Sequence, residues 1–396
     1  MTELFIKDLR GLYKKYKQSN SWKSAIACAK YLIDMAPDHP AYYRMAGRAC
    51  ALAGDRDLAS EYYEEFLLRI HGCPIPELVD KVRQTLPMDL NNVESTYEYI
   101  GGRNSFGSIL HRVNNNIVFY TKIQINFENY SKELFFYKNR KKLLTNRFNS
   151  PDLIGEITID DMNYLTISFL KGTPAGLDNV ADVVRAAVSI ASAGDVWRMS
   201  VHNKDCTLKV RSRSLTSIIR FFSCIDQKSV NDSLVDDLRI CLEKTTHAVE
   251  GRQVLDRLAA IVQGKMAYKL LDVSRHFSVV HGDFFPCNIS IDESSGEVNV
   301  IDWASLMLGL KSIDIATYLC RLKFNFSDIK KHALSGFPEF FESPVDRVFF
   351  VYTVIAMNIC LLRTSDAHYQ YNSRIVNDVL LPAIDYFEQE FSLIAS

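Results

Sequence analysis

The sequence predicts an α+β protein in which an all-helical region is followed by a lobe built on an antiparallel sheet and then by a larger, mainly helical lobe. Three observations lead to this fold class. A shift of 34 residues superimposes similar residues within segment 1–72, short β-branched runs separated by turn residues fill 96–125, and helical apolar stripes prevail after residue 179. We therefore expect domains at 1–92, 93–172 and 173–396.

The composition narrows the class of protein. The chain has 396 residues, a hydrophobic fraction of 47% and a formal net charge of −1, which fits a globular protein with a sizeable core and argues against a nucleic-acid partner. Its nine cysteines are odd in number and lack paired C-x-x-C spacing, so we expect neither a disulfide framework nor a zinc site, and a cytoplasmic location. The longest apolar run, 348–362, is shorter than the roughly 20 residues of a transmembrane helix, so none is expected.

The helical region has the 34-residue period of tetratricopeptide repeats. Ala25 matches Ala59 and Asn20 matches Gly54 under this shift, and Pro37 ends the second helix of the first copy. Small residues at such positions let antiparallel helices approach closely around aromatic side chains. An ordinary four-helix cap is the alternative interpretation.

Two repeats rarely bury a continuous core by themselves. A further helix around 76–86, or the neighbouring lobe, should therefore complete the stack. Arrays of this kind usually bind proteins, so we expect a protein partner or a homodimer through the repeats.

The next segment predicts strands separated by turns, at 96–100, 108–113, 117–125, 154–159 and 164–167. The turn after the first strand is rich in glycine. Gly102 in this turn allows a phosphate to approach the backbone, and Asn104 or Ser105 can donate hydrogen bonds to it.

Lys122 lies in the middle of the third apolar strand. Its position after two strands and a glycine turn favours contact with the α- and β-phosphates of a nucleotide, although a lysine on an exposed strand face is the alternative. Two downstream carboxylates, Glu128 and Glu133, are candidates to hold its ammonium group, and Glu133 lies within a predicted helix over 130–144.

Residues 279–303, VVHGDFFPCNISIDESSGEVNVIDW, concentrate the polar residues that carry chemistry. The pattern predicts a buried strand, a loop with Asp283 and Asn288, and a hairpin that Asp302 closes. Phosphoryl transfer requires a carboxylate near the attacking hydroxyl and oxygen ligands for magnesium. Because Mg²⁺ takes few protein oxygens, Asn288 and Asp302 can hold it, which leaves Asp283 to accept the substrate proton. Ordinary turn-forming residues are the alternative.

The segment HGDFFPCNI, followed after a short hairpin by VIDW, resembles the aminoglycoside phosphotransferase and choline kinase family. The resemblance implies a bilobal, protein-kinase-like fold after residue 92, with ATP or GTP as phosphoryl donor and Mg²⁺ as cofactor. It implies that His281 keeps the shape of the catalytic loop, that Asp314 braces this loop, and that Glu133 rather than Glu128 orients Lys122.

The resemblance also makes SFLKGTP the hinge between the lobes, where the main chain of Ser168, Phe169 and Leu170 reads adenine. Two positions depart from the family pattern. Many relatives carry an acidic residue in place of Ser168, and relatives often have an acid directly after IDW, where Ala304 stands here.

The C-terminal segment is expected to form a wall of the acceptor pocket. Its candidates are aromatic residues that can stack on a sugar or surround an ammonium group, and acids that can pair with amines: Phe340, Phe341, Tyr369, Tyr371, Glu339, Glu342, Asp346 and Asp366. A helical core is the alternative.

Together these features predict an ATP-dependent phosphotransferase that acts on a hydroxyl of a small molecule, namely a sugar, an amino sugar or an amino alcohol. Two alternatives remain: a kinase for a protein docked by the repeats, and a nucleotide-binding scaffold without catalysis.

Overall fold

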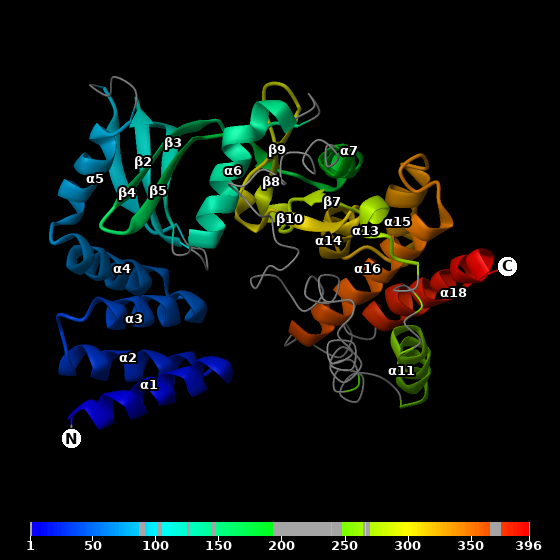
Figure 1. Ribbon diagram of the computed structural model, residues 1–396, viewed down its shortest axis with the longest axis horizontal. Coiled ribbons are helices and arrows are strands. Elements are labelled where there is room, and N and C mark those ends of the chain that lie inside the picture. The colour runs from blue at the N-terminus through cyan, green and yellow to red at the C-terminus, as the bar shows by residue number, and fades with distance from the viewer. Residues whose placement is uncertain are drawn as a thin grey trace. The chain divides into compact units, whose positions relative to one another are not determined.

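The computed structural model describes residues 2–86, 92–100, 105–124, 127–143, 148–192, 239, 248–263, 266, 270–364 and 374–395. The chain divides into two compact units (Figure 1). Unit 1 comprises Met1–Leu134 and Pro151–Phe169, and unit 2 comprises Phe135–Ser150 and Leu170–Ser396.

Unit 1 begins with helices that follow one another as a stack (Figure 1). They are α1 (Thr2–Gln18), α2 (Trp22–Met35), α3 (Pro40–Ala53), α4 (Arg56–His71) and α5 (Ile75–Gln84). Gly54 ends α3 with a φ of 87°, and the side chain of Asp55 caps α4 by accepting from Leu58 N at 3.2 Å. At Gly47 an added Cβ would lie 2.8 Å from the ring of Tyr63, which is the close packing of small on aromatic residues that the sequence predicts.

The sheet of unit 1 has the order β1-β2-β3-β5-β4, and all neighbouring strands are antiparallel. The strands are β1 (Glu94–Glu98), β2 (Ser105–Val113), β3 (Asn116–Gln124), β4 (Leu153–Ile159) and β5 (Met162–Ser168). Two tight turns join neighbours in this sheet. Asn114 and Asn115 between β2 and β3 have φ of 49° and 65°, and Asp160 and Asp161 between β4 and β5 have φ of 48° and 61°, as hairpin turns with left-handed residues require.

The helical stack and the sheet share one hydrophobic core within unit 1. Tyr63 and Phe66 from α4 pack against Phe106 from β2, with ring centroids 5.5 and 4.7 Å apart. At the end of α4, His71 Nδ1 lies 2.8 Å from Asp160 Oδ2 and His71 Nε2 lies 2.7 Å from the hydroxyl of Tyr164. The sheet therefore completes the core of the helical stack. The tetratricopeptide nature of these helices stays a prediction.

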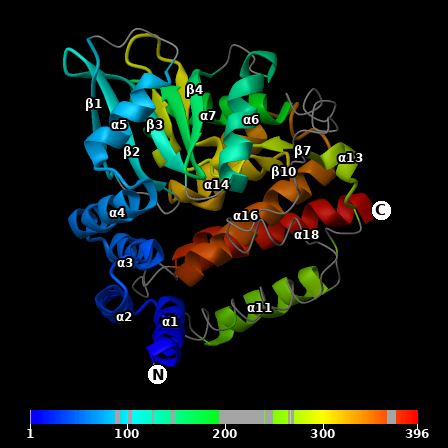
Figure 2. The same cartoon turned by 60° about the vertical axis from the view of Figure 1, so that its left-hand side comes forward.

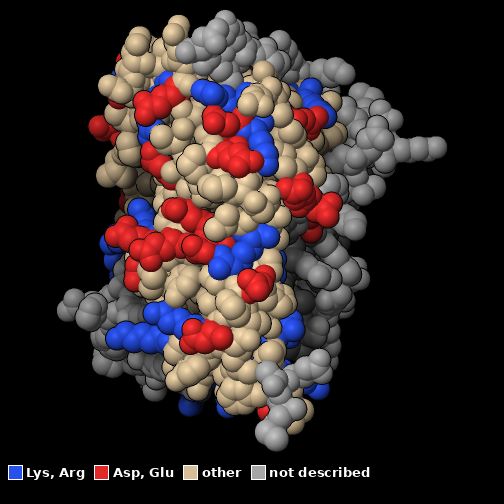
Figure 3. All heavy atoms as spheres, turned by 90° about the vertical axis from the view of Figure 1, so that its left-hand side faces the viewer, with Lys and Arg blue, Asp and Glu red and all other residues tan. Residues whose placement is uncertain are grey.

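The face shown in Figure 3 carries charges of both signs over α1–α5 and the strands above them. Lys and Arg alternate there with Asp and Glu, and uncharged residues separate them. A large patch of positive charge, which would attract polyanions, is not seen on the described residues of this face.

The helix α6 (Phe127–Leu143) begins in unit 1 and continues into unit 2. Unit 2 contains two small antiparallel sheets, β7 (Phe277–Val280) with β10 (Met307–Leu310), and β6 (Thr173–Pro174) with β8 (Ile289–Ile291) and β9 (Val298–Val300). Its other regular elements are mostly helical: η1 (Leu177–Asn179), α7 (Val180–Ser192), α11 (Ala248–Gln263), α13 (Val273–His276), η2 (Pro286–Asn288), η3 (Trp303–Ser305), α14 (Ile313–Arg321), α15 (Phe326–Lys330), η4 (Lys331–Ser335), α16 (Pro344–Thr364), η5 (Ile375–Leu380) and α18 (Leu381–Ala395).

Helices α16 and α18 lie side by side in both views (Figures 1 and 2) and bury the apolar run that the sequence assigns to a core helix. Phe350 and Ile355 of α16 and Phe387 of α18 are at most 1% exposed. None of the described helices combines the length and the apolar character that crossing a membrane requires.

Candidate active site

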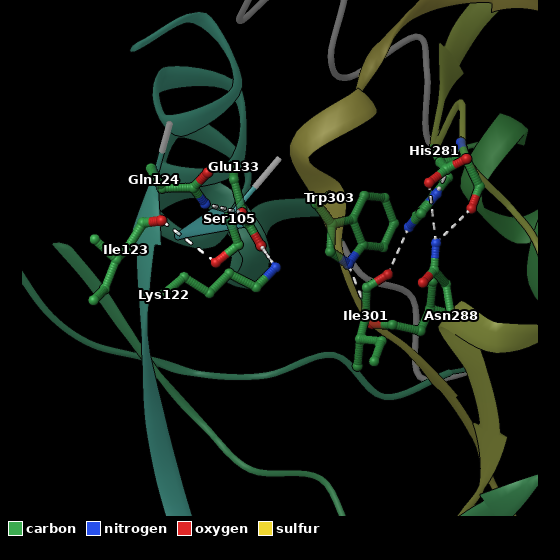
Figure 4. Close-up of polar contacts among 11 residues, drawn as sticks. Ser105, Lys122, Ile123, Gln124, Glu133, His281, Asn288, Ile301 and Trp303 are labelled. Atoms are coloured by element: carbon green, nitrogen blue, oxygen red, sulfur yellow. Dashed lines mark hydrogen bonds and ion pairs between the residues drawn. The ribbon is translucent and has the colours of Figure 1, made fainter. Parts of the chain in front are cut away.

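A buried ion pair joins β3 and α6 in unit 1. Lys122 Nζ lies 2.6 Å from Glu133 Oε1, and the carboxylate of Glu133 is fully buried (Figure 4). Gln124 donates from Nε2 to the other oxygen, Glu133 Oε2, at 2.8 Å. Glu128 pairs instead with Lys132, at 3.0 Å, so the structure places Glu133 and not Glu128 on Lys122.

Gln124 is a site residue that was not predicted from the sequence. A signal was present, because residues i and i+2 of a strand project from the same face, and Gln124 follows Lys122 at this spacing on β3. Two strand residues therefore hold both oxygens of one helical carboxylate, and this arrangement fixes Lys122 in one position.

The glycine-rich turn is described only from Ser105 onward, and the predicted residues Gly102 and Asn104 lie outside the described residues. Ser105 Oγ donates to the carbonyl of Gly107 at 2.7 Å and accepts from Gly107 N at 3.1 Å. Gly107 has a φ of 131°, and an added Cβ would meet the Tyr97 ring at 2.5 Å. The packing of Tyr97 therefore accounts for this glycine, and contact of Ser105 with a phosphate stays a prediction.

The predicted hinge begins at the end of β5. Ser168 N donates to Asp152 O and Phe169 N donates to Val118 O, both at 2.9 Å. The hydroxyl of Ser168 accepts from Asp152 N at 2.8 Å. An adenine cannot be read through these two N–H groups while they bond within the sheet. Recognition of adenine by Ser168, Phe169 and Leu170 stays a prediction, restricted to their other main-chain groups.

In unit 2, His281 anchors the predicted catalytic loop at the end of β7. The side chain is fully buried, and its Nε2 donates to Ile301 O at 2.9 Å (Figure 4). Its Nδ1 accepts from Asp283 N at 3.2 Å. Both ring nitrogens thus engage main-chain groups of the loop and of the hairpin, as expected of a residue that shapes the loop rather than transferring a proton.

Asp283 and Asn288 lie next to each other within this loop. Asn288 donates from Nδ2 to Asp283 O at 2.8 Å and to Asp283 Oδ2 at 3.3 Å. Because both contacts use the amide nitrogen, Oδ1 of Asn288 lies on the other side of the amide. The bend Pro286–Asn288, whose first residue is a proline at its first helical position, gives the loop this form.

The carboxylate of Asp302 affects the pKa of Asp283. Burial raises the pKa of Asp283 from 3.8 to about 6, and the negative charge of Asp302 contributes in the same direction. Asp302 has a left-handed backbone, with φ of 66° and ψ of 62°. A residue other than glycine rarely adopts this conformation unless its surroundings impose it.

The donor set fits a magnesium ion. Among the described residues no group of three or more His, Cys, Asp or Glu side chains forms a metal cluster. Mg²⁺ needs only one or two protein carboxylates, because water and nucleotide phosphates supply its other ligands. Asn288 Oδ1 and the carboxylate of Asp302 would hold the ion, and its positive charge would relieve the repulsion between Asp302 and Asp283.

Asp314, in the first turn of α14, supports the loop from beneath. Its Oδ2 accepts from His281 N at 2.7 Å and its Oδ1 accepts from Gly282 N at 3.0 Å. Gly282 has a φ of 80°, which glycine adopts without strain. Burial raises the pKa of Asp314 to about 7, while the two hydrogen bonds act in the opposite direction.

Aromatic rings pack beneath the hairpin. Trp303 stacks on Phe136 of α6, with ring centroids 3.6 Å apart and planes 8° from parallel, and its Nε1 donates to Val300 O at 3.2 Å. His281 meets the same indole edge-on at 4.6 Å. This stack fixes the residue directly after Asp302.

Three residues of the expected acceptor wall lie around one small cavity. Phe340, Phe341 and Asp346 line it with His276 and Leu310. Leu310 pairs with Phe277, at the end of the β7–β10 strand pair that lies away from the catalytic loop, roughly 13 Å along the strand from His281. Contact of these residues with an acceptor stays a prediction. Tyr369, Tyr371 and Asp366 lie outside the described residues.

Comparisons with known proteins show what this chain is similar to. Residues 229–337 match the phosphotransferase enzyme family. An aminoglycoside phosphotransferase from Alicyclobacillus acidocaldarius is 12% identical, with 81% of this chain and 96% of that chain covered and a TM-score of 0.50. Choline kinases from Cryptosporidium parvum (11% identical, 81% and 94% covered, TM-score 0.44) and Streptococcus pneumoniae (11%, 79% and 98%, TM-score 0.40) are also similar. No curated protein matches the sequence.

The likeness at a TM-score of 0.50 shows the fold, an antiparallel-sheet lobe followed by a helical lobe of the protein-kinase-like type. The expected fold class is confirmed at this level. The expected resemblance is confirmed as well, because the matched segment includes the catalytic loop and the hairpin that carry it.

Proposed function

We propose that this chain, whose residues 229–337 belong to the phosphotransferase enzyme family, transfers the γ-phosphoryl group of ATP to a hydroxyl of a small molecule. The acceptor classes are a sugar, an amino sugar and an amino alcohol. The observation that carries the proposal is the catalytic loop, in which Asp283 is hydrogen-bonded to Asn288 and lies within electrostatic reach of Asp302.

In the proposed reaction Asp283 orients the acceptor. Its carboxylate accepts a hydrogen bond from the hydroxyl, whose oxygen attacks the γ-phosphorus while the bond from phosphorus to the β,γ-bridging oxygen breaks. The hydroxyl proton passes to Asp283, and ADP leaves. Because the transition state of phosphoryl transfer is loose, orientation contributes more to the rate than the basicity of Asp283.

Asn288 and Asp302 would hold Mg²⁺, which neutralises charge on the phosphates when it is bound. His281 and Asp314 position these groups through the main chain, since the first bonds Ile301 O and the second accepts from two N–H groups of the loop.

Unit 1 contributes the cation of the proposed reaction. Lys122 binds nucleotide phosphate, and Glu133 together with Gln124 keeps the ammonium group in place. Only a lysine that is held in position stabilises the charge of the transition state without an entropic cost at the moment of reaction.

The test is phosphoryl transfer from ATP with Mg²⁺ across a panel of sugars, amino sugars and amino alcohols. We expect Asp302→Asn to lower the rate by about 10³-fold or more, because a metal ligand is lost. The exposed Asp178→Asn is the matched control, since it removes the same charge from unit 2 outside the loop. Full activity of Asp302→Asn would contradict the assigned site, and a wild-type protein that binds ATP but phosphorylates no acceptor would support the scaffold alternative.

A further inference from the structure

Helix α14 contacts the catalytic loop along a single stripe. Asp314, Tyr318 and Arg321 are spaced by four and three residues, so their side chains share one face of the helix. Asp314 accepts from His281 N and Gly282 N, and Tyr318 meets Phe284 edge-on at 6.2 Å. Successive turns of α14 therefore meet successive residues of the loop.

Arg321 is the last residue of this stripe and lies beside Phe285. Its guanidinium carbon lies 4.6 Å from the ring centroid of Phe285, over the ring face. Phe285 N donates to Asp283 O at 2.8 Å, so the ring that carries Arg321 is tied to the proposed acceptor-binding residue. The guanidinium makes no hydrogen bond to another described residue, so its N–H groups are available for a bidentate contact.

The charge of Arg321 has no carboxylate partner among the residues that the structure describes. The contact of Arg321 with the Phe285 ring and the hydrogen bond from Phe285 N to Asp283 O join this charge to the catalytic loop. An exposed cation thus lies near the carboxylate that the acceptor hydroxyl must approach.

We propose that Arg321 binds an anionic group, a carboxylate or a phosphate, on the hydroxyl-bearing acceptor. The inference rests on the proposed function and specifies its substrate class. It disfavours an acceptor of the choline type at this position, because the ring face of Phe285 on which an ammonium group would stack is covered by Arg321, and because the two positive charges repel.

The test compares matched acceptors that differ in one anionic group: glycerate with glycerol, gluconate with glucitol, and glucosamine 6-phosphate with glucosamine, with choline as a further cationic acceptor. For wild type we expect the anionic member of at least one pair to have the higher kcat/KM. Arg321→Gln should lower kcat/KM for that member by roughly 10- to 100-fold and for its partner without the anionic group by less than about threefold. Arg185→Gln, which removes an exposed arginine from α7, is the control and should leave the ratio unchanged.

Charge reversal sharpens the test. Arg321→Glu should invert the preference within the pair, whereas loss of packing on Phe285 alone would lower both members equally. A preference for the neutral or cationic members in wild type, or an unchanged ratio in Arg321→Gln, overturns the inference while transfer to those members upholds the proposed function. A rise in KM for ATP without a change for the acceptor also overturns it, because the anion is then the nucleotide's.

If no member is phosphorylated, binding of glycerate, gluconate and glucosamine 6-phosphate is measured by calorimetry in the presence of Mg²⁺ and ADP. Binding that Arg321→Gln abolishes supports the anion site even though the proposed reaction fails. Absence of binding, or equal binding by the variant, overturns the inferred anion site.

Discussion

The proposed reaction depends most on Asp283, and the surroundings of its carboxylate oppose its negative charge. Burial raises its pKa from 3.8 to about 6, Asp302 adds to this effect, and the hydrogen bond from Asn288 and the charge of Arg321 act in the opposite direction. A group placed for function in this way reduces the stability of the fold at neutral pH.

Replacing Asp283 by Asn should therefore stabilise the protein in the absence of metal. The folded-state pKa is raised, so the stability associated with this group is complete below about pH 4 and is lost as the pH rises through about 6. The shift from 3.8 to about 6 is about two pKa units, which corresponds to about 3 kcal/mol. We expect Asp283→Asn to gain about 2 to 3 kcal/mol at pH 8.

Chemical unfolding with EDTA present measures this gain as a function of pH. The advantage of the variant should grow between about pH 4 and pH 6 and stay constant above that range. A variant that is less stable than wild type at pH 8 would show that the charge of the Asp283 carboxylate does not destabilise the fold.

Glu133→Gln tests the placement of Lys122. The substitution keeps the shape and the contact with Gln124 but removes the charge 2.6 Å from Lys122 Nζ. We expect KM for ATP to rise about tenfold while KM for the acceptor is unchanged. Glu128→Gln is the control, since Glu128 pairs with Lys132. Equal effects of the two substitutions on KM for ATP would refute the role of Glu133.

Gly107→Ala separates two costs of replacing a glycine. At Gly107 the positive φ and the close ring of Tyr97 both oppose a side chain, whereas Gly296, with a φ of 72°, has no atom within 4 Å of an added Cβ. We expect Gly296→Ala to cost about 1 kcal/mol and Gly107→Ala about 2 to 4 kcal/mol of unfolding free energy. Equal costs in urea unfolding would mean that the Tyr97 contact is unimportant.

At the scale of elements, the end of α4 is joined to the sheet by one buried histidine. His71 contacts Asp160 and Tyr164 through its two ring nitrogens, at 2.8 and 2.7 Å. The sequence has His71 where the repeat of Pro37 would fall. In the structure His71 is the last residue of α4, which ends at the left-handed Gly72, and its ring also makes a polar contact with the β4–β5 turn.

His71→Leu should lower the free energy of unfolding by about 2 kcal/mol, because the Tyr164 hydroxyl loses its partner in a buried site. The exposed His39→Leu is the control and should change stability by less than about 0.5 kcal/mol. Urea unfolding of both variants makes the comparison, and a neutral His71→Leu would show that the helical stack is held by apolar packing alone.

The elements that the sequence predicts best are those with a strong local pattern. The strands around Lys122 and the hairpin from Ile289 to Asp302 follow from β-branched runs and turn residues. The shared core of α4 and the sheet follows only in outline, because periodicity shows that a helix has an apolar face but not which surface covers it. For the same reason the sequence does not show what covers Phe340 and Phe341, which line a cavity with Leu310 of β10.

At the scale of the whole molecule, the helical region and the small lobe form one unit rather than two. Removing residues 1–72 would expose Phe106 of β2 and Tyr99, directly after β1, which contact Tyr63. A docking role of the repeats is therefore tested better by substitutions on exposed residues of α1, such as Phe5 and Leu12, than by deletion.

The loop residues follow from sequence spacing and the supports His281, Asp314 and Glu133 from the family resemblance, whereas two further contacts were not predicted. Asp283, Asn288 and Asp302 are polar residues at the ends of short strands, so sequence spacing reveals them. Gln124 and Arg321 act through a strand face and a helix face respectively, and these contacts exist only once the chain has folded.

The proposed role of Asp283 in phosphoryl transfer is tested by comparing wild type with Asp283→Asn. Transfer of labelled γ-phosphate to an acceptor is measured at saturating ATP and Mg²⁺, and the affinity for ATP is determined in parallel. We expect wild type to phosphorylate the acceptor. The variant should transfer the phosphoryl group at a rate at least about 10³-fold lower, with unchanged affinity for ATP. Transfer by Asp283→Asn at the wild-type rate would contradict this role.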